Sequence, residues 1–363
     1  MKAAILNAPT GRFDIEDIAI DAPKGREVLV EVKASGLCHS DLHIASGNFG
    51  MPLPAVLGHE LAGVVLALGP DVKDFAVGDH VVGSLIACCG ACPPCRDHRS
   101  FQCDHPETTQ RPPEHGPRLS RGDEPVTAGL GTAAFAERAL VHENQLARIP
   151  DEMPFAQASL LGCGVITGVG AVRNSAKVAP SETVVVIGAG GVGLNVVAGA
   201  KLAGAARIIV VDAQPAKEKL ARRFGATDFI DASAADPVEA VMALTGRGAD
   251  QIFEVVGKPA LLRQAVRMVR KGGAVNVIGI PQPGETVEFE VLTDLIRRQV
   301  TIRGVYMGAS NIKDDVPRLA RDYLAGKLNL DDLISDEIAL DDINAAYARL
   351  EGGAVARSVI TRF

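Results

Sequence analysis

The stretch TVVVIGAGGVGLNVVAGAKLAGAARIIVVD, residues 183–212, decides the fold of the second half of the chain. It opens with a β-branched run, residues 183–187, which is typical of a buried parallel strand. The spacing GxGxxG follows at residues 188–193, and the apolar pattern of a helix continues from it. A second strand pattern ends in Asp212. A strand, this glycine spacing, a helix and an acid about 20 residues further on together indicate a dinucleotide-binding βαβ unit.

The parts of this unit have distinct expected roles. Glycines allow a tight turn and let the backbone approach a pyrophosphate at the start of a helix. The carboxylate of Asp212 would accept hydrogen bonds from the adenosine ribose and repel a 2′-phosphate, so we expect NAD rather than NADP. The alternative interpretation of Asp212 is a helix cap. The residues of this stretch that we expect to contact the cofactor are Gly188, Gly190, Gly191, Val192, Gly193 and Asp212.

Strand and helix patterns continue to alternate after Asp212. Strands are predicted in DFIDA, DQIFEVVG, AVNVIGI and QVTIRGVY, and helices near residues 237–245 and 260–269. This alternation predicts a doubly wound Rossmann domain of about six parallel strands. We expect residues 271–273, Lys-Gly-Gly, to end a helix. The tail, residues 310–363, predicts two amphipathic helices and a last strand that pack back on the first domain.

The first half of the chain has short strand patterns instead. Residues 28–35, 61–69 and 79–84 are predicted strands separated by turn residues, which favours a compact, barrel-like β domain. Residues 104–128 are rich in Pro, His, Arg and Gly without apolar periodicity, and predict a long surface loop. Residues 153–178 predict a helix, a glycine turn and a second helix.

Composition narrows the class of protein. The chain has 363 residues and a net charge of −7, which argues against a nucleic-acid partner. Its apolar runs are shorter than the ~18 residues that a membrane span needs, and its start has no signal-peptide pattern. We therefore expect a cytoplasmic protein without a membrane partner. Disulfides are rare in that compartment, so the seven cysteines favour metal binding.

Four cysteines have the spacing of a closed metal site. The pattern Cys-x2-Cys-x2-Cys-x7-Cys lets thiolates close on one tetrahedral Zn²⁺ without a water ligand, which is typical of a structural zinc. A reactive or iron–sulfur cysteine loop is the alternative. Cys88 stands beside the set and makes its register ambiguous by one residue. The expected ligands are Cys89, Cys92, Cys95 and Cys103.

A second polar cluster lies in GLCHSDLHIASGNFGMPLPAVLGHELAG, residues 36–63. Cys38 and His59 are candidate zinc ligands, whereas the alternative is a polar loop with solvated histidines. An open zinc site needs a third protein ligand, for which the unpaired Cys163 is the candidate. The remaining polar side chains that could tune such a site or carry a proton are Ser40, Asp41, His43 and Glu60.

These motifs together resemble one family over essentially the whole chain, the zinc-dependent medium-chain alcohol dehydrogenases. The family signature G-H-E-x2-G occurs at residues 58–63, followed in the family's order by the four-cysteine lobe, the Gly-Cys-Gly stretch and the Rossmann fingerprint. The resemblance implies an α/β fold with a GroES-like β-barrel catalytic domain, residues 1–164 and 308–363, and a Rossmann NAD-binding domain, residues 165–307. It also implies two Zn²⁺ per chain and NAD.

Roles for single residues follow from the same resemblance. It implies that Cys38, His59 and Cys163 hold a catalytic zinc, that Glu60 is a carboxylate able to approach the metal, and that Asp41 orients His59. Ser40 and His43 would relay the proton of the alcohol, whose pKa the zinc lowers, before hydride passes to NAD. The residues expected to contact the cofactor outside the fingerprint are Lys217 near the ribose, His39 and Arg357 near the pyrophosphate, and Thr167.

The implied activity is reversible hydride transfer between a primary alcohol or aldehyde and NAD. The resemblance places three apolar residues at pocket positions, Phe49, Leu85 and Leu130, which favours uncharged substrates. Phe49 argues against a glutathione-dependent formaldehyde dehydrogenase, because those members of the family carry a polar or acidic residue there. Cys163 argues against a polyol dehydrogenase. The alternatives are a zinc-dependent reductase of bulky or aromatic aldehydes and a non-catalytic dinucleotide-binding relative. The long loop at residues 104–128 resembles that of the dimeric branch of the family, which implies a homodimer joined through edge strands near residues 300–305.

Overall fold

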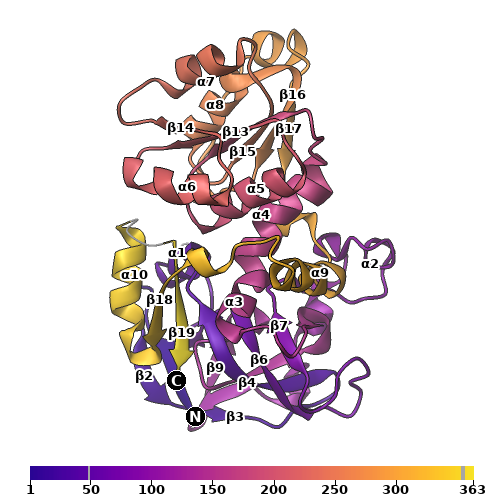
Figure 1. Ribbon diagram of the computed structural model, residues 1–363. Coiled ribbons are helices and arrows are strands. Elements are labelled where there is room, and N and C mark those ends of the chain that lie inside the picture. Colours follow the sequence, from indigo (N-terminus) through magenta and orange to yellow (C-terminus); the bar gives the residue numbers. More distant parts are fainter. Residues whose placement is uncertain (48–49, 353–355) are drawn as a thin grey trace. The chain divides into compact units, whose positions relative to one another are not determined.

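The computed structural model describes residues 1–47, 50–352 and 356–363, so Phe49 lies outside the described residues. The chain forms two compact units. The first unit consists of Met1–Gly164 and Ser310–Phe363, and the second is Val165–Ala309. Figure 1 shows the elements of each unit.

The first unit is built on two β-sheets. One sheet has the strand order β2 (Asp14–Asp17), β1 (Lys2–Leu6), β5 (Ala55–Val56), β9 (Glu124–Ala128), β8 (Leu119–Arg121) and β3 (Ala19–Ile20). The other has the order β11 (Leu146–Arg148), β7 (His80–Gly83), β6 (Glu60–Leu68), β4 (Glu27–Gly36), β19 (Arg357–Arg362) and β18 (Ile334–Ala339), with β10 (Arg138–His142) also paired to β4. The three strands predicted in this half, which correspond to β4, β6 and β7, are confirmed.

Alternation along β4 explains why this sheet has a buried face. Val28, Val30 and Val32 point into one apolar cluster, where they meet Leu61 and Val65 of β6. Successive side chains of a strand point to opposite faces, so a period of two in the sequence becomes one apolar face. Burying such a side chain contributes about 1.5–3 kcal/mol, which makes this register strongly preferred.

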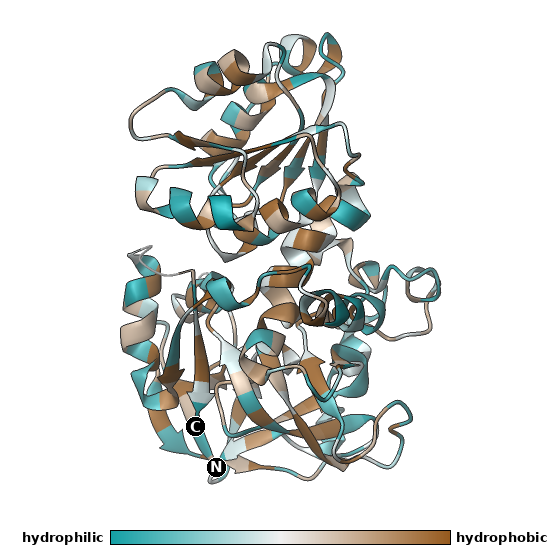
Figure 2. Ribbon diagram, in the orientation of Figure 1, coloured by the Kyte–Doolittle hydropathy of each residue, from teal (hydrophilic) through white to brown (hydrophobic). Residues whose placement is uncertain are grey.

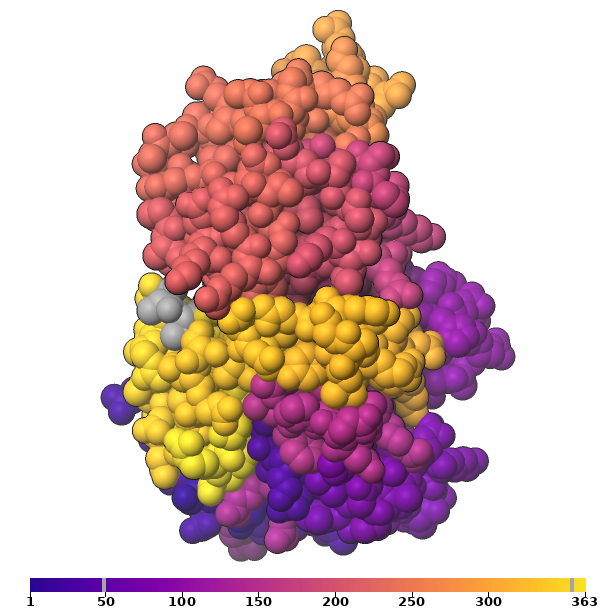
Figure 3. Space-filling view, viewed as in Figure 1, coloured from indigo at the N-terminus to yellow at the C-terminus, as the bar shows by residue number. Residues whose placement is uncertain are grey.

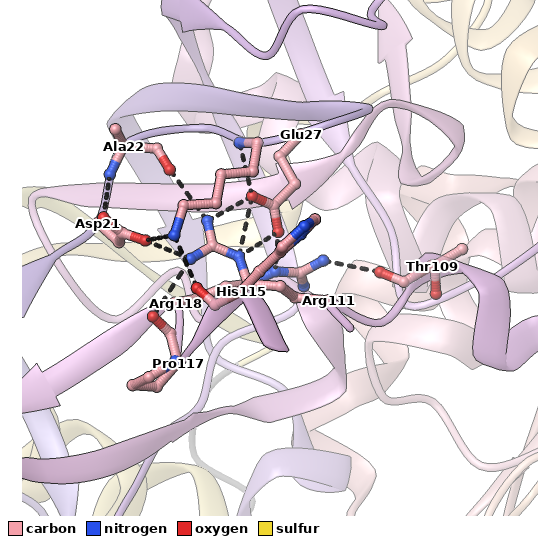
Figure 4. Close-up of polar contacts among 9 residues, drawn as sticks. Asp21, Ala22, Glu27, Thr109, Arg111, His115, Pro117 and Arg118 are labelled. Carbon is pink, nitrogen blue, oxygen red and sulfur yellow. Dashed lines mark hydrogen bonds and ion pairs between the residues drawn. The ribbon is translucent and has the colours of Figure 1, made fainter. Parts of the chain in front are cut away.

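Residues 104–128 are not the structureless loop that the sequence predicts. They contain one-turn helices at Pro106–Thr109 and Pro113–His115 and then the hairpin of β8 and β9. Two arginines anchor the segment to the carboxylate of Glu27, because Arg111 Nε and Arg118 Nε donate to it at 3.0 and 2.7 Å (Figure 4). The strands are too short, and the anchoring acid too distant in sequence, for a local pattern to show them.

Within residues 153–178, Phe155–Ala176 forms one continuous helical segment, so the predicted glycine turn is wrong. The segment runs through α3 (Phe155–Leu160), a π-helical turn (Leu161–Val165), α4 (Ile166–Gly170) and a second π-helical stretch (Ala171–Ala176). Gly162 serves close packing instead, because a Cβ there would lie 2.2 Å from the carbonyl oxygen of Gly83. Cys163 therefore projects from a π-helical turn, a feature frequent at functional sites.

The same segment, Phe155–Ala176, is the helix among the described residues that is long and apolar enough to cross a membrane. However, 83% of its apolar window is buried inside the structure, as in the core helix of a folded domain.

The second unit is a parallel sheet covered by helices on both faces. The strand order is β14 (Asp228–Asp231), β13 (Arg207–Asp212), β12 (Thr183–Ile187), β15 (Ala249–Glu254), β16 (Val269–Val277) and β17 (Thr301–Gly304). Figure 1 shows α7 (Pro237–Thr245) and α8 (Pro259–Met268) on one face and α5 (Gly191–Leu202) and α6 (Glu218–Phe224) on the other. Figure 2 shows that the strands between them are strongly apolar. This is the predicted Rossmann sheet, and its strand order reverses direction between β12 and β15.

One local prediction in this unit is wrong. Residues 271–273 do not end a helix, because α8 ends at Met268 and the segment lies inside β16. A Cβ on Gly273 would lie 2.8 Å from the carbonyl oxygen of Asp250, so this glycine lets β16 approach β15. A glycine after a helical pattern can thus mark close strand packing as well as a helix end.

The tail returns to the first unit, as expected. It forms α9 (Ile312–Leu324), β18, α10 (Ile343–Glu351) and β19, and Val359 pairs with Gly36 of β4. The strand β18 is an element that the sequence pattern did not indicate. Figure 3 shows the tail in gold and yellow as a continuous part of the surface of this unit.

Candidate active site and structural metal centre

Four buried side chains of the first unit converge on one point. Cys38, His59, Glu60 and Cys163 each offer one ligand atom, and these atoms all lie within 4.8 Å of one another. Cys38 precedes α1 (His39–Ala45), His59 and Glu60 stand at the start of β6, and Cys163 comes from the π-helical turn. The fold therefore brings together the three ligands and the carboxylate that the sequence predicted as one site.

His59 is held in a defined orientation by Asp41. Oδ1 of Asp41 lies 3.0 Å from His59 Nδ1 and accepts the Gly58 amide at 3.1 Å, and both side chains are fully buried. Gly58 has φ +96°, and a Cβ there would lie 2.7 Å from the Phe135 amide nitrogen, so this turn requires glycine. A proton on Nδ1, held by the carboxylate, leaves the Nε2 lone pair of His59 available for a metal.

The donor set fits zinc. Among the described residues, His59 Nε2 and Glu60 Oε2 are buried polar atoms without a hydrogen-bond partner. Buried polar atoms of this kind are rare in folded proteins and indicate a missing ligand such as a metal ion. Two thiols, an imidazole and a nearby carboxylate form a soft to borderline set that suits Zn²⁺.

The protonation of these groups depends on their mutual contacts. A hydrogen bond from Cys163 and the nearby His59, opposed by burial, lower the pKa of the Cys38 thiol well below its ordinary value. Burial raises the pKa of Glu60 to about 7, although the charge of Arg357 opposes that rise. The site can thus present a thiolate to a metal while it limits the negative charge beside it.

Arg357 makes a contact that the sequence did not predict. Its guanidinium is buried, with Nη2 3.5 Å from Glu60 Oε1, and that same oxygen accepts the Gly164 amide at 3.3 Å. The register of β19, β4 and β6 produces this contact, because Gly36 pairs with both Val359 and Glu60. Within the first unit Arg357 therefore neutralises Glu60, and its expected role near the pyrophosphate stays a prediction.

The remaining predicted residues of this region lie on α1. Ser40 and His43 are three residues apart on one face of the helix and half-buried, whereas Asp41 on another face is fully buried. His39, the first residue of the helix, is exposed. The geometry thus allows a path from Ser40 to His43 toward solvent, and the relay itself stays a prediction.

The four-cysteine cluster forms as its spacing predicts. The sulfur atoms of Cys89, Cys92, Cys95 and Cys103 lie within 4.8 Å of one another. Backbone amides donate to these sulfurs, for example from Cys92 to Cys89 Sγ at 3.3 Å and from Cys89 to Cys103 Sγ at 3.2 Å. Such N–H groups stabilise thiolates that share one cation.

Cys88 stands outside this cluster. Its Sγ donates to the Asn144 carbonyl at 3.7 Å, and Asn144 Nδ2 donates back to the Cys88 carbonyl at 2.8 Å. Burial raises the pKa of the Cys88 thiol to about 11, which keeps it protonated. The geometry therefore favours the register that starts at Cys89.

The second unit places the glycine fingerprint at the end of β12. Gly188 has φ +104°, and a Cβ on Gly193 would lie 1.8 Å from the Gly188 carbonyl oxygen, so helix α5 starts in close contact with the turn. Gly190 is the N-cap of α5, and a Cβ there would meet nothing within 4 Å. Gly191 and Val192 form the first turn of that helix. The amides of this turn are thus open to an anion at a helix N-terminus.

Asp212 binds to that glycine turn. Its Oδ2 accepts the Ala189 amide at 2.7 Å and lies 3.2 Å from Lys217 Nζ, while Oδ1 accepts the Gln214 amide at 2.9 Å. The N-cap of the one-turn helix that follows is Gln214, so Asp212 is not the cap that the alternative interpretation required. Thr167, the other expected contact in this unit, is buried with its hydroxyl 3.7 Å from Met307 Sδ.

Comparison with known proteins agrees with this geometry. Residues 24–151 match the model of the alcohol dehydrogenase GroES-like domain, and residues 191–323 match that of the zinc-binding dehydrogenase domain. An S-(hydroxymethyl)glutathione dehydrogenase of Escherichia coli O1:K1 is 36% identical over 369 residues, covering 99% of this chain and 99% of that protein.

Two solved structures are similar over nearly their whole length. An alcohol dehydrogenase zinc-binding domain protein from Burkholderia ambifaria has a TM-score of 0.94 at 38% identity and covers 99% of this chain and 98% of its own. The benzyl alcohol dehydrogenase from Acinetobacter calcoaceticus has a TM-score of 0.94 at 35% identity and covers 100% of this chain and 99% of its own.

The chain therefore belongs to the zinc-dependent medium-chain alcohol dehydrogenase family, with a GroES-like domain and a Rossmann domain. It is an oxidoreductase of the class that acts on small-molecule alcohols or aldehydes with zinc and a dinucleotide cofactor. The predicted family, fold class and cofactor types are confirmed.

Proposed function

We propose that this protein catalyses reversible hydride transfer between an uncharged primary alcohol or its aldehyde and NAD. The observation that carries the proposal is the buried cluster of Cys38, His59, Glu60 and Cys163, with Asp41 behind the imidazole. Three protein ligands leave one position of a tetrahedral zinc for substrate, which is the arrangement of catalytic rather than structural zinc sites.

The residues of the first unit would have separate roles in catalysis. When bound, Zn²⁺ supplies Lewis-acid polarisation of the substrate oxygen and favours its deprotonation. Ser40 and His43 would take the released proton to solvent, since an imidazole can accept and donate a proton at physiological pH. Asp41 keeps His59 in the tautomer that binds a metal through Nε2. Arg357 holds the Glu60 carboxylate on the side of the Gly164 amide.

Support for NAD over NADP comes from Asp212. Its carboxylate is fixed at the end of β13 by the Ala189 amide and Lys217. A fixed negative charge at this position would accept ribose hydroxyls and repel a 2′-phosphate.

The proposed substrate class rests on Leu85 and Leu130, which the resemblance to the family places in the substrate pocket. Leu85 comes two residues after Gly83, which pairs with Leu61 beside the ligand segment, and Leu130 lies next to Gly129, whose Cβ would meet the Val56 carbonyl oxygen at 2.7 Å. Both leucines are half-buried and apolar, which favours an uncharged substrate. The similar benzyl alcohol dehydrogenase supports an aromatic alcohol within this class.

A second candidate substrate comes from the relative from Escherichia coli, whose name specifies S-(hydroxymethyl)glutathione. S-(hydroxymethyl)glutathione is charged and benzyl alcohol is not, so one assay of the rates with both substrates distinguishes the two candidates. The alternative function, reduction of aromatic aldehydes, would use the same site in the reverse direction. The direction in the cell depends on the concentrations of alcohol, aldehyde and the two forms of the cofactor.

The test is a screen of NADH release with benzyl alcohol, straight-chain primary alcohols and S-(hydroxymethyl)glutathione, run with NAD and with NADP. We expect the highest kcat/KM for benzyl or medium-chain alcohols with NAD, and loss of activity in Cys38→Ala. Preference for S-(hydroxymethyl)glutathione would replace the substrate assignment, and activity retained by Cys38→Ala would refute the catalytic zinc. Absence of turnover with one zinc per chain would favour a non-catalytic relative.

We also propose a cytoplasmic homodimer that pairs through β17. This strand ends the sheet order of the second unit, and the preceding helical turn exposes Val291, Leu292 and Ile296 by 59, 49 and 62%. An open strand edge beside exposed apolar side chains is a common dimer surface. Light scattering after gel filtration should give twice the chain mass, and Ile296→Lys should lower it to the monomer value.

A further inference from the structure

In the Rossmann unit the strand order reverses between β12 and β15, and sheets of this kind have their ligand-binding crevice at such a point. Ligands of such sheets bind outside the carboxyl ends of the strands at this point. Ile187 and Glu254 are the last residues of the two strands and pair with each other. The turn after Glu254, residues 255–258, lies against the glycine turn after β12, because a Cβ on Gly188 would lie 2.7 Å from Val256 Cγ2. It therefore borders the expected crevice.

Glu254 directs its carboxylate into that turn rather than toward solvent. The residue is 1% exposed, and its Oε1 accepts the amides of Val256 and Gly257, both at 2.9 Å. Its main-chain carbonyl accepts the amides of Ile278 and Gly279 at 2.8 and 3.0 Å. One residue therefore fixes two loops at the mouth of the crevice, the turn after β15 and the loop after β16.

The two loops pack backbone against backbone. Gly257 has φ +85°, and a Cβ there would lie 2.5 Å from the Ile280 carbonyl oxygen. A Cβ on Gly279 would lie 2.0 Å from the Gly257 amide nitrogen. The two loops are thus in close backbone contact, and the hydrogen bonds of Glu254 position both of them.

Burial of a carboxylate is costly, and an apolar residue at this position would remove that cost. The hydrogen bonds of the Glu254 carboxylate both serve the turn beside the glycine fingerprint. Within that turn, Val255 Cγ2 would lie 3.2 Å from a Cβ on Gly193. The exposed apolar side chains of the two loops, Val256 at 42% and Ile280 at 48%, are thereby held at the crevice mouth.

We propose that Glu254 is a positioning residue for the dinucleotide: its buried carboxylate holds the turn of residues 255–258 in the conformation that receives the cofactor. The inference rests on the dinucleotide binding of the proposed function. Glu254 acts through the turn and need not touch the reacting atoms.

The same strand provides a matched control. Asp250 stands near the opposite end of β15, is 7% exposed, and also fixes a neighbouring segment, since its Oδ2 accepts the Thr183 amide at 2.8 Å. Loss of either acid should destabilise the sheet, but only Glu254 lies at the crevice. A purely structural role would therefore make Glu254→Ala and Asp250→Ala alike in cofactor binding.

The test is the dissociation constant of NADH, measured by fluorescence titration of the full-length protein and its variants, with the melting temperature recorded for each. Glu254→Ala should weaken NADH binding about tenfold, because the turn loses its fixed position. It should also raise KM for NAD more than it lowers kcat. Glu254→Gln should restore binding to within about threefold, since the amide oxygen can still accept both N–H groups. Asp250→Ala should change it less than about twofold.

Unchanged NADH binding in a folded Glu254→Ala, or equal weakening in Asp250→Ala, would overturn the inference and leave the proposed function intact. If Glu254→Ala does not fold, Glu254→Asp replaces it, because the shorter side chain keeps the charge but cannot reach both amides. Equal binding by Glu254→Asp and Glu254→Gln would then overturn the inference. A wild-type protein that binds neither NADH nor NADPH would overturn the proposed function and this inference together.

Discussion

The Nδ1 atom of His59 lies 3.0 Å from Oδ1 of Asp41, with both side chains fully buried. This pair fixes the ring so that Nε2 faces the sulfur atoms of Cys38 and Cys163. A carboxylate behind a metal-binding histidine sets its tautomer and raises its basicity. We therefore expect the proposed metal site to depend on Asp41, which is not itself one of the proposed ligands.

Asp41→Ala should lower the affinity of the site for zinc about 10–100-fold, because the ring of His59 loses its orientation. Competition with a chelator measures that affinity, and kcat/KM for the best alcohol should fall with it. Asp17→Ala is the control, since Asp17 is an exposed acid of β2. Equal zinc affinity in wild type and Asp41→Ala would contradict the role of Asp41.

Cys88→Ala should keep the zinc of the cysteine lobe, whereas Cys92→Ala should lose it. The reason is that Cys92 belongs to the cluster and Cys88 hydrogen-bonds to Asn144 instead. The loss should also lower the thermal midpoint of Cys92→Ala by several degrees, because a structural zinc contributes directly to folding free energy. Elemental analysis counts the metal, and loss of zinc from Cys88→Ala would show that the register is shifted.

Glu27→Gln should lower the free energy of unfolding by about 3 kcal/mol, because it leaves the charges of Arg111 and Arg118 buried and poorly compensated. Urea unfolding at neutral pH measures the change. The control is Glu124→Gln, which breaks an exposed ion pair with Arg121 and should cost less than about 1 kcal/mol. Equal effects of the two substitutions would contradict a buried anchor.

Acid should weaken the same anchor. Burial alone would raise the pKa of Glu27, but hydrogen bonds from Arg111, the Lys24 amide and Arg118 hold it below its ordinary value of 4.5. A carboxyl group with a lowered pKa stabilises the fold fully above its ordinary pKa, and this contribution is lost as the pH falls through the lowered value. The stability difference between wild type and Glu27→Gln should therefore shrink below about pH 4.5. A difference that stays constant from neutral pH to pH 3 would contradict this.

Asp212→Asn should raise the ratio of kcat/KM with NADP to that with NAD at least about tenfold, because a neutral amide no longer repels a 2′-phosphate. Initial rates with both cofactors test this. Asp231→Asn is a matched control, since Asp231 pairs with Asp212 at the end of the neighbouring strand β14. A shift of the same size in Asp231→Asn would mean that net charge, and not the position of Asp212, sets the preference.

Much of this structure is predictable because its signals are local. The strand, glycine turn and helix of the Rossmann unit follow one another within residues 183–212, and the cysteine spacing of residues 89–103 closes on itself. The contacts missed were those between residues distant in sequence. Arg357 meets Glu60 only through the strand pairing of β19 with β4 and of β4 with β6.

The same reason explains two of the wrong structural predictions. Gly162 and its neighbours suggested a turn, but the helical segment continues through Cys163. Glycine is needed at position 162 because the carbonyl oxygen of Gly83 in β7 leaves no room for a Cβ. The composition of residues 104–128 suggested a surface loop, because Glu27, the common partner of Arg111 and Arg118, lies in β4, far from them in sequence. Local composition does not distinguish a charged side chain in water from one in a buried ion pair.

Zinc content of Cys163→Ala, measured together with alcohol turnover, tests the central claim most directly, because this ligand joins the ligand segment from a π-helical turn far along the chain. Wild type should contain about two zinc ions per chain and the variant about one, with turnover of the best alcohol reduced at least about 1000-fold. Retention of both zinc ions and of turnover in Cys163→Ala would contradict the account.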